Sequence, residues 1–74
     1  MATLIIHTDI ECNIYIDTEF HGFAEANTDY VINVGVGAYW ILCKCIDDES
    51  ISTDFDVRIM ADNTTCAKTI NLSE

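Results

Sequence analysis

The amino-acid sequence predicts an all-β fold, a small two-sheet antiparallel β-sandwich of about seven short strands, built as a single domain over residues 1–74. Three observations support this prediction. The 74-residue chain contains no proline, and no long segment repeats its apolar residues at helical spacing. Its β-branched and aromatic residues instead occur in short runs, separated by clusters of Asp, Asn, Gly and Ser. This pattern of strand-like runs and turn residues is typical of sandwiches and barrels.

The central element is predicted in the segment from Gly35 to Ile46, GVGAYWILCKCI. Its glycines favour a turn, and a run of aromatic and aliphatic residues follows without a strand breaker. Burying Lys44 without a partner would be costly, so the face opposite to Lys44 is predicted to point inward. The predicted inner residues are Tyr39, Ile41, Cys43 and Cys45. Trp40 and Leu42 are then expected on the outer face with Lys44.

Further strands are expected at Thr3–His7, Glu11–Asp17, Phe23–Ala26, Tyr30–Val34, Ser52–Met60 and Thr64–Leu72. In three of them the apolar residues predict which side chains face the core: Cys12, Ile14 and Ile16; Phe55, Val57 and Ile59; Cys66, Ile70 and Leu72. The segment from Asp17 to Gly22 is expected to be a tight connection in which Gly22 adopts a positive φ.

The core-facing phase also predicts how the central strand pairs with the strand at Ser52–Met60. A three-residue loop, Asp48-Glu49-Ser50, would place Asp47 opposite Ile51. The opposed inner pairs would be Cys43 with Phe55 and Ile41 with Val57. The opposed outer pairs would be Lys44 with Asp54, as a salt bridge, and Trp40 with Arg58, as a cation–π contact.

The order of these segments resembles the PEGA domain family, a small β-sandwich module of bacterial and archaeal multidomain proteins. In this chain Asp17 ends an alternating strand, Gly22 follows, and Gly37-Ala38-Tyr39 opens the central strand, as in the family pattern. Three features depart from it: Asp9-Ile10-Glu11-Cys12 replaces the Pro-x-Gly-Ala turn, Thr18 stands where glycine is usual, and no proline follows Gly22. The resemblance covers about residues 3–46. It implies an accessory module of a larger surface or signalling protein, with no catalytic motif to carry over.

The net charge and the hydropathy of the chain limit which classes of molecule are expected as its partners. The net charge is −10, from 13 acidic residues against 3 basic ones. Such a surface repels nucleic-acid phosphates and anionic lipid headgroups, so neither is expected as a partner. No apolar run approaches the roughly 20 residues of a membrane span, so membrane insertion is not expected.

The 4 cysteines are predicted to be free thiols, with one disulfide and a metal site as the alternatives. Cys43 and Cys45 lie two residues apart on a strand, so their Cα atoms would be about 6.5–7 Å apart with parallel Cβ vectors, a poor geometry for a disulfide. The first residues lack the basic and long apolar regions of an export signal. A reducing compartment is therefore slightly favoured, and the localisation stays open.

Neither a cofactor nor a metal is expected. The densest acidic cluster consists of Asp47, Asp48, Glu49, Asp54 and Asp56. Its spacing lacks the glycine and the terminal glutamate of an EF-hand loop, so a solvated acidic hairpin is predicted and a weak calcium site is the alternative. A zinc site could combine the cysteines with His7 and His21, but Cys-x-Cys within a strand is not the usual ligand spacing.

An enzyme is not expected either, because the chain lacks a nucleophile elbow, a phosphate loop and a metal-binding helix motif. So small a sandwich is also expected to offer little volume for a pocket, since ligand pockets begin at about 300 Å³. The sequence therefore favours a non-catalytic interaction or scaffolding module whose partner is a protein or a neighbouring domain.

The interface candidates are Trp40, Leu42, Arg58 and Tyr15, because they are expected outside the core and Trp, Tyr and Arg are enriched at interface anchors. Apolar side chains on that exterior are also expected to cause weak self-association. The alternative function is a carbohydrate-binding module, in which Trp40, Tyr15 and Phe20 form a stacking platform.

Overall fold

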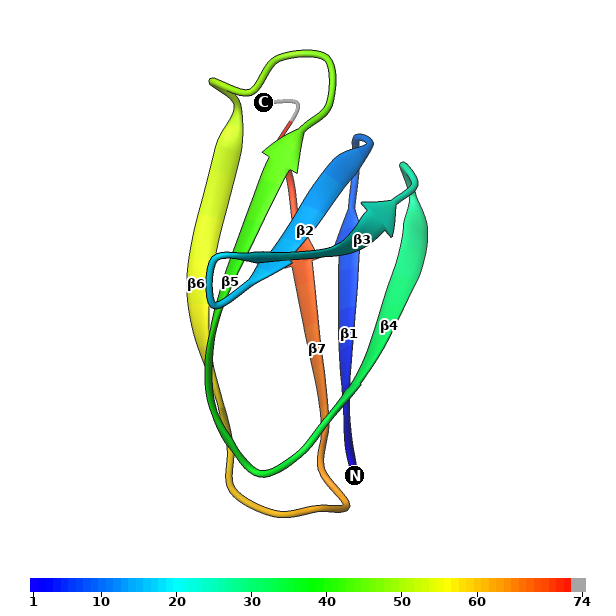
Figure 1. Cartoon of the computed structure of the whole chain (residues 1–74). Coiled ribbons are helices and arrows are strands. Elements are labelled where there is room, and N and C mark those ends of the chain that lie inside the picture. Colours follow the sequence, from blue (N-terminus) through cyan, green and yellow to red (C-terminus); the bar gives the residue numbers. More distant parts are fainter. Residues whose placement is uncertain (73–74) are drawn as a thin grey trace.

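The computed structural model describes residues 1–72, and these residues form seven strands and no helix (Figure 1). The strands are β1 (Ala2–Thr8), β2 (Cys12–Ile16), β3 (Glu19–Ala24), β4 (Thr28–Val34), β5 (Gly37–Cys45), β6 (Ser52–Ile59) and β7 (Thr65–Ile70). They form two sheets, with strand orders β4-β1-β7 and β3-β2-β5-β6. The all-β class and the two-sheet sandwich are therefore confirmed. Residues 73–74 of the predicted domain lie outside the described residues.

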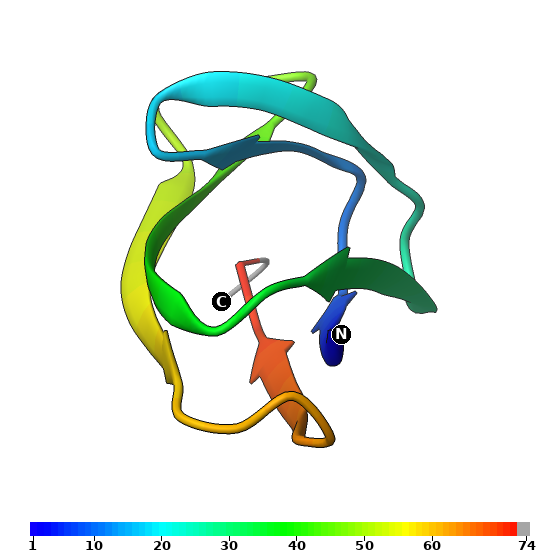
Figure 2. The ribbon, with the colours of Figure 1, turned by 60° about the horizontal axis from the view of Figure 1, so that its bottom comes forward.

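The four-stranded sheet is antiparallel, whereas the three-stranded sheet is mixed. β1 pairs with β4 in the antiparallel and with β7 in the parallel direction, so the first and last described strands lie side by side. The connections β1–β2, β3–β4, β4–β5 and β6–β7 pass from one sheet to the other. Figure 2 shows the resulting closed arrangement, in which strands of both sheets surround the centre of the molecule.

The core lies between the sheets and is formed by alternate residues of the strands. Its largest fully buried side chains include Leu4, Ile6, Ile14, Ile41 and Ile59. Burying each of them is worth about 1.5–3 kcal/mol. The inner residues predicted on β2, β5, β6 and β7 are either buried or packed against this core, so the predicted faces are confirmed.

The turn after β2 is shorter than predicted. Ile16 pairs with Glu19, so Asp17 and Thr18 form the hairpin turn. Their φ angles of 50° and 73° are typical of the two-residue turns that match the twist of a hairpin. β3 therefore begins at Glu19 rather than at Phe23. The prediction was wrong here because this turn contains no glycine to mark it in the sequence.

Gly22 has a different role from the predicted one. It lies within β3 opposite Ile14 and does not adopt a positive φ. A Cβ atom at this position would collide with the phenol of Tyr30, which reaches across from β4. Glycine therefore allows Tyr30 to pack against β3, at the side of the sandwich where the two sheets meet.

β5 and β6 pair in a register two residues away from the predicted one. The observed partners include Ile41 with Phe55, Tyr39 with Val57, Trp40 with Asp56, Ala38 with Arg58 and Lys44 with Ser52. The predicted pairs Lys44–Asp54, Trp40–Arg58, Cys43–Phe55 and Ile41–Val57 are therefore wrong. The faces are nevertheless right, because a shift by two residues leaves every side chain on the same side of the sheet.

The loop between β5 and β6 explains this shift. The amide of Cys45 donates to the carbonyl of Ile51 at 2.9 Å, so the chain leaves the ladder earlier than predicted. Asp48 then orders the loop, because its Oδ1 accepts from the Ser50 hydroxyl at 2.6 Å and from the Ser50 amide at 3.0 Å. These two bonds lower the pKa of the Asp48 carboxyl. The loop is thus set by a local aspartate turn rather than by the shortest closure.

Candidate functional site: an aromatic outer face

The outer face of the four-stranded sheet gathers aromatic side chains that point away from the core. We define the aromatic face as Tyr15, Phe20, Phe23, Trp40 and Leu42. The strand register aligns Phe20 of β3, Tyr15 of β2 and Leu42 of β5 in one row. Phe23 begins the neighbouring row on one side, and Trp40 lies in the neighbouring row on the other. Three adjacent strands therefore contribute to a continuous surface.

A bulge in β3 is what places both of its phenylalanines on this face. Phe20 pairs with Tyr15 and Gly22 pairs with Ile14, so His21 is an additional residue without a partner position on β2. In a regular strand, residues three apart would point to opposite faces. The additional residue restores the phase, and Phe23 and Phe20 both point outward.

Two of the rings, those of Tyr15 and Phe20, contact each other. The Tyr15 and Phe20 rings meet edge to face, with centroids 5.7 Å apart and an interplanar angle of 71°. Lys44 Nζ lies 5.4 Å from the Tyr15 ring centroid. Tyr15 is therefore held between an aromatic edge and a cation, which orders the centre of the face. Phe20 remains 61% exposed and Phe23 41% exposed.

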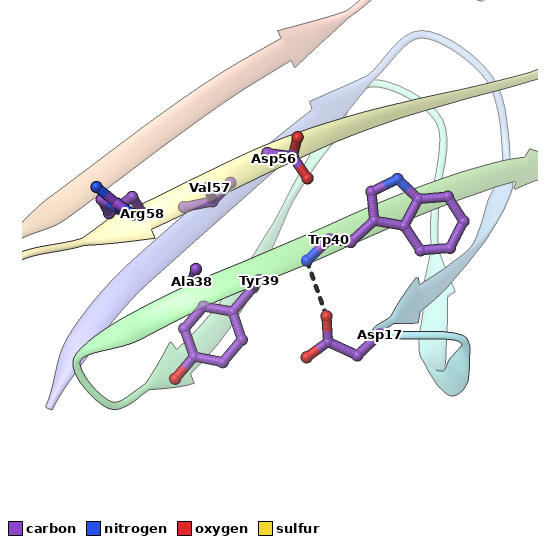
Figure 3. Close-up of a pocket in the computed structure, with 7 residues that line it drawn as sticks. All are labelled: Asp17, Ala38, Tyr39, Trp40, Asp56, Val57 and Arg58. Atoms are coloured by element: carbon purple, nitrogen blue, oxygen red, sulfur yellow. Dashed lines mark hydrogen bonds between the residues drawn. The ribbon is translucent and has the colours of Figure 1, made fainter.

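Trp40 is fixed by Asp17, from the turn between β2 and β3 (Figure 3). The Asp17 amide donates to the Trp40 carbonyl at 2.8 Å, and the Trp40 amide donates to Asp17 Oδ1 at 2.9 Å. One residue thus satisfies both main-chain polar groups of Trp40. The backbone that carries the indole is tied to the turn, which positions the half-buried ring at the end of the face.

A solvent-open depression of about 460 Å³ adjoins the indole. It is lined by Asp17, Ala38, Tyr39, Trp40, Asp56, Val57 and Arg58 (Figure 3). This volume is larger than the sequence predicted for so small a domain. An indole, carboxylates and a guanidinium therefore surround one concave region, which can offer stacking and hydrogen bonds to the same ligand.

The four interface candidates lie on this side of the molecule. Tyr15, Trp40 and Leu42 belong to the aromatic face, and Arg58 lies on β6 beside Ala38. Arg58 lines the depression together with Trp40, but Asp56 occupies the position opposite the indole. The predicted stacking of Arg58 on Trp40 is therefore wrong, and the two side chains are well separated in Figure 3.

Acidic residues border the aromatic face. Asp54 and Asp56 lie along β6, and Asp17 lies at the turn between β2 and β3; all three are exposed. Lys44 is half-buried on the same outer face, where its Nζ lies over the Tyr15 ring. With a net charge of −10, the domain attracts cationic groups toward this border.

The histidines considered as metal ligands are engaged elsewhere. His7 Nδ1 lies 2.9 Å from Asp29 Oδ1, and His21 Nδ1 lies 2.7 Å from the Tyr30 hydroxyl. Burial raises the pKa of Tyr30. Over residues 1–72, no group of three or more His, Cys, Asp or Glu side chains is arranged to hold a metal ion. The zinc and calcium alternatives therefore have no ligand set in that part of the chain.

No family model, curated protein or solved structure matches this chain. Within the described residues, no helix is long and apolar enough to cross a membrane.

Proposed function

We propose that the chain is a non-catalytic interaction module that binds a protein partner through the aromatic face. We further propose that it is a PEGA-like accessory domain of a larger bacterial protein. That assignment is supported by the segments around Asp17, Gly22 and Gly37-Ala38-Tyr39. The binding role is supported by the placement of the rings.

The observation that carries the proposal is the row of outward side chains formed by Phe20, Tyr15 and Leu42 across β3, β2 and β5, with the Trp40 ring in the neighbouring row. These side chains occupy outward positions, so the core does not require their size. Phe20 nevertheless presents a large aromatic surface to solvent, with 61% of the residue exposed. Rings of this kind bury a large area on binding at a low cost in side-chain entropy. An ordered, partly exposed cluster is thus better explained by a partner than by folding.

The charge of the surroundings indicates the chemistry of that partner. Asp54 and Asp56 line one side of the aromatic face, and Asp17 lies at one end. We propose a segment that offers apolar groups to the rings and Lys or Arg side chains to the acidic border. Complementary charges of this kind raise the association rate and set the orientation of the partner.

Selection from a displayed peptide library tests this function directly. The expected binders combine apolar with basic residues. Phe20→Ser should weaken their binding about tenfold or more, since a ring at an interface centre commonly contributes over about 1.4 kcal/mol. Val31→Ser is the matched control, because Val31 is 56% exposed on the outer face of the other sheet. If the binders lost affinity equally for both variants, or for neither variant, the aromatic face would not be their binding surface.

Carbohydrate binding is the second candidate, favoured by the depression beside Trp40. There an aromatic ring stands next to the carboxylates of Asp17 and Asp56, a combination that suits the apolar face and the hydroxyls of a sugar. The predicted platform is only partly assembled, since Tyr15 and Phe20 touch and Trp40 lies one row away. Trp40 is the 1 tryptophan of the chain, so a glycan panel can be titrated against its fluorescence. Saturable quenching at millimolar or tighter concentrations supports sugar binding, and no response to any glycan rejects it.

A further inference from the structure

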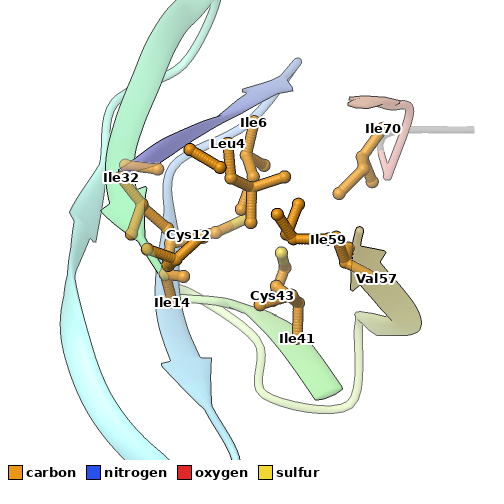
Figure 4. Packing of buried hydrophobic residues seen from close by; sticks show 13 residues of the cluster. Leu4, Ile6, Cys12, Ile14, Ile32, Ile41, Cys43, Val57, Ile59 and Ile70 are labelled. Atoms are coloured by element: carbon orange, nitrogen blue, oxygen red, sulfur yellow. The ribbon is translucent and has the colours of Figure 1, made fainter. Parts of the chain in front are cut away.

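Two cysteines face each other across the inner side of the four-stranded sheet. Cys12 of β2 and Cys45 of β5 are direct partners in the ladder. Both belong to the core side, with 0% of Cys12 and 7% of Cys45 exposed. Figure 4 shows the neighbouring Cys12 and Cys43 side chains among the buried aliphatic residues. The pair therefore lies at the end of the sheet next to the loop that follows Cys45.

The hydrogen-bond pattern indicates how close the two thiols are. The Ile46 amide donates to the Glu11 carbonyl, so the Glu11–Ile46 pair is hydrogen-bonded. Hydrogen-bonded and non-hydrogen-bonded pairs alternate along an antiparallel ladder, so Cys12 and Cys45 form a non-hydrogen-bonded pair. The Cα atoms of such a pair are about 4.5 Å apart, which falls within the roughly 4.4–6.8 Å of disulfides.

The other cysteines are unsuitable partners. Cys43 and Cys45 lie two residues apart on β5, with side chains parallel to each other. Cys43 is opposite Ile14 and therefore diagonal to Cys12, at a Cβ distance of up to about 7–8 Å against the roughly 3.5–4.5 Å of a disulfide. Cys66 lies on β7 in the other sheet. The geometry thus selects one pair of the four free thiols.

We propose that Cys12 and Cys45 are a redox modification site that forms a reversible disulfide across β2 and β5. The oxidant is a small-molecule disulfide such as glutathione disulfide. The Cys45 thiolate attacks one of its sulfurs, and one glutathione leaves as a thiolate that takes up a proton. Cys12 loses its proton and attacks the Cys45 sulfur of this mixed disulfide, which releases the second glutathione. The two protein thiols lose two electrons and two protons, and the glutathione disulfide gains them.

The order of attack follows from the surroundings. Cys45 ends β5 and keeps a small exposed area beside the open loop. Burial raises the pKa of the Cys12 thiol, and proximity to Cys45 raises it further. Cys12 therefore stays protonated at neutral pH and reacts second. The resulting disulfide would fix the two strands that carry Tyr15 and Trp40 on their other side.

Peptide mapping of the oxidised chain tests the proposal. The folded protein is incubated with glutathione disulfide at about pH 9, where a large share of an ordinary thiol is ionised, then alkylated in denaturant and digested with trypsin. Cleavage after Lys44 separates Cys12 from Cys45, so the disulfide joins the peptides covering residues 1–44 and 45–58. We expect these two peptides to be found linked. Fragmentation of the peptides should show that Cys43 and Cys66 are alkylated. A lasting glutathione adduct on Cys45, a link through Cys43, or four alkylated cysteines would overturn the proposal.

Variants and an equilibrium measurement complete the test. Cys43→Ala and Cys66→Ala should retain the link, and Cys12→Ala and Cys45→Ala should lose it. The equilibrium constant for forming the Cys12–Cys45 disulfide can be measured in the wild-type chain, without any variant. It should be on the order of 100-fold larger in the folded protein than in denaturant. That ratio follows from the entropy of closing the intervening loop. An equal or smaller constant in the folded protein would mean that the sheet does not hold the thiols in bonding geometry.

Discussion

The two outer faces of the sandwich follow the same strand alternation but carry different side chains. The three-stranded sheet presents mostly small, polar or β-branched residues outward: Thr3, Ile5, His7, Asp29, Val31, Asn33, Thr65, Ala67 and Thr69. Its polar contacts join side chains across β1 and β4, as between His7 and Asp29. The four-stranded sheet presents the aromatic face, in which the Tyr15 ring contacts Phe20 and Lys44.

This difference separates what the fold needs from what a site needs. Both sheets bury their inner side chains in the same core, so their outer faces could have been equally small and polar. The three-stranded sheet shows that such a face is compatible with this fold. The rings on the other sheet are therefore an addition, and clustered exposed apolar groups of this kind are typical of binding surfaces.

The largest effect is expected at the inner faces, where the sheets are alike. Ile6 of β1 and Ile14 of β2 are both 0% exposed. Substitution by alanine should lower the free energy of unfolding by about 2–5 kcal/mol at either position, which approaches the whole stability of a small domain. Substitution by valine, at about 0.5–1.5 kcal/mol, keeps the comparison measurable in urea denaturation followed by Trp40 fluorescence. A much larger loss at one position would mean that the sheets differ inside as well as outside.

Alkaline pH should weaken the four-stranded sheet through its thiols. Burial, with a smaller contribution from Cys12, raises the pKa of Cys43 from 9.0 to about 12. The unfolded chain ionises this thiol above pH 9.0, and the folded chain keeps it neutral. The contribution to stability is therefore complete below pH 9.0 and is lost as the pH rises to about 12. Urea denaturation across this range should show a steeper fall for the wild type than for Cys43→Ala. Equal slopes would mean that other groups, such as the tyrosines, cause the fall.

The sequence predicted the strands and their faces well because both depend on alternation and on the cost of burying a charge. Lys44 alone decided the phase of β5, and the structure confirms that phase. The errors fall at turns. The Asp17-Thr18 turn and the Asp48 turn are each held by two hydrogen bonds of an aspartate, those of Asp17 being to Trp40, 23 residues away in the chain. Such bonds leave no periodic signal in a sequence.

Alternation along the strands also explains why the sequence predicted part of the candidate site. Tyr15, Trp40 and Leu42 were identified because alternation placed them outside the core. Phe23 and Asp17 were missed. The direction of Phe23 depends on the bulge at His21, and the role of Asp17 depends on the register between β2 and β5. Neither feature follows from local sequence preference, because each needs the partner strand to be in place.

A smaller loss of stability is expected from substituting Asp17, which bonds to Trp40 in the four-stranded sheet, or Asp29, which bonds to His7 in the three-stranded sheet. Asp17→Ala removes the bond to the Trp40 amide and leaves alanine at a φ of 50°, so the free energy of unfolding should fall by about 1–2 kcal/mol. Asp17→Asn keeps an acceptor and tolerates this φ, so it should stay within about 0.5 kcal/mol of the wild type. Asp29→Ala breaks an exposed contact with His7 and should cost less than about 1 kcal/mol. Thermal denaturation and Trp40 emission measure all three. A loss for Asp29→Ala as large as that for Asp17→Ala would contradict the special role of the turn.

Phe20→Ser and Val31→Ser should cause the smallest change in stability. They should also show the clearest difference between the two outer faces. Each should alter the free energy of unfolding by less than about 0.5 kcal/mol, because both residues are largely exposed. We expect the wild type to self-associate weakly, at high micromolar concentrations, and only Phe20→Ser to abolish this. Sedimentation at several concentrations measures it. A wild type that stays monomeric to millimolar concentration, with blue-shifted Trp40 emission, would mean that the rings are shielded within the domain.

Salt then distinguishes self-association from binding of a basic partner at the same face. Two copies of a chain with net charge −10 repel each other, and added salt screens that repulsion. Self-association through Phe20 should therefore strengthen as the ionic strength rises. A segment rich in Lys or Arg is attracted by Asp54 and Asp56, and the same screening should weaken its binding. The two interactions should respond to salt in opposite directions. If Phe20→Ser abolishes both of them and Val31→Ser retains both, the two interactions use the same aromatic face. If binding of the basic segment strengthened with salt, the acidic border would have no part in it, and the rings alone would account for the affinity.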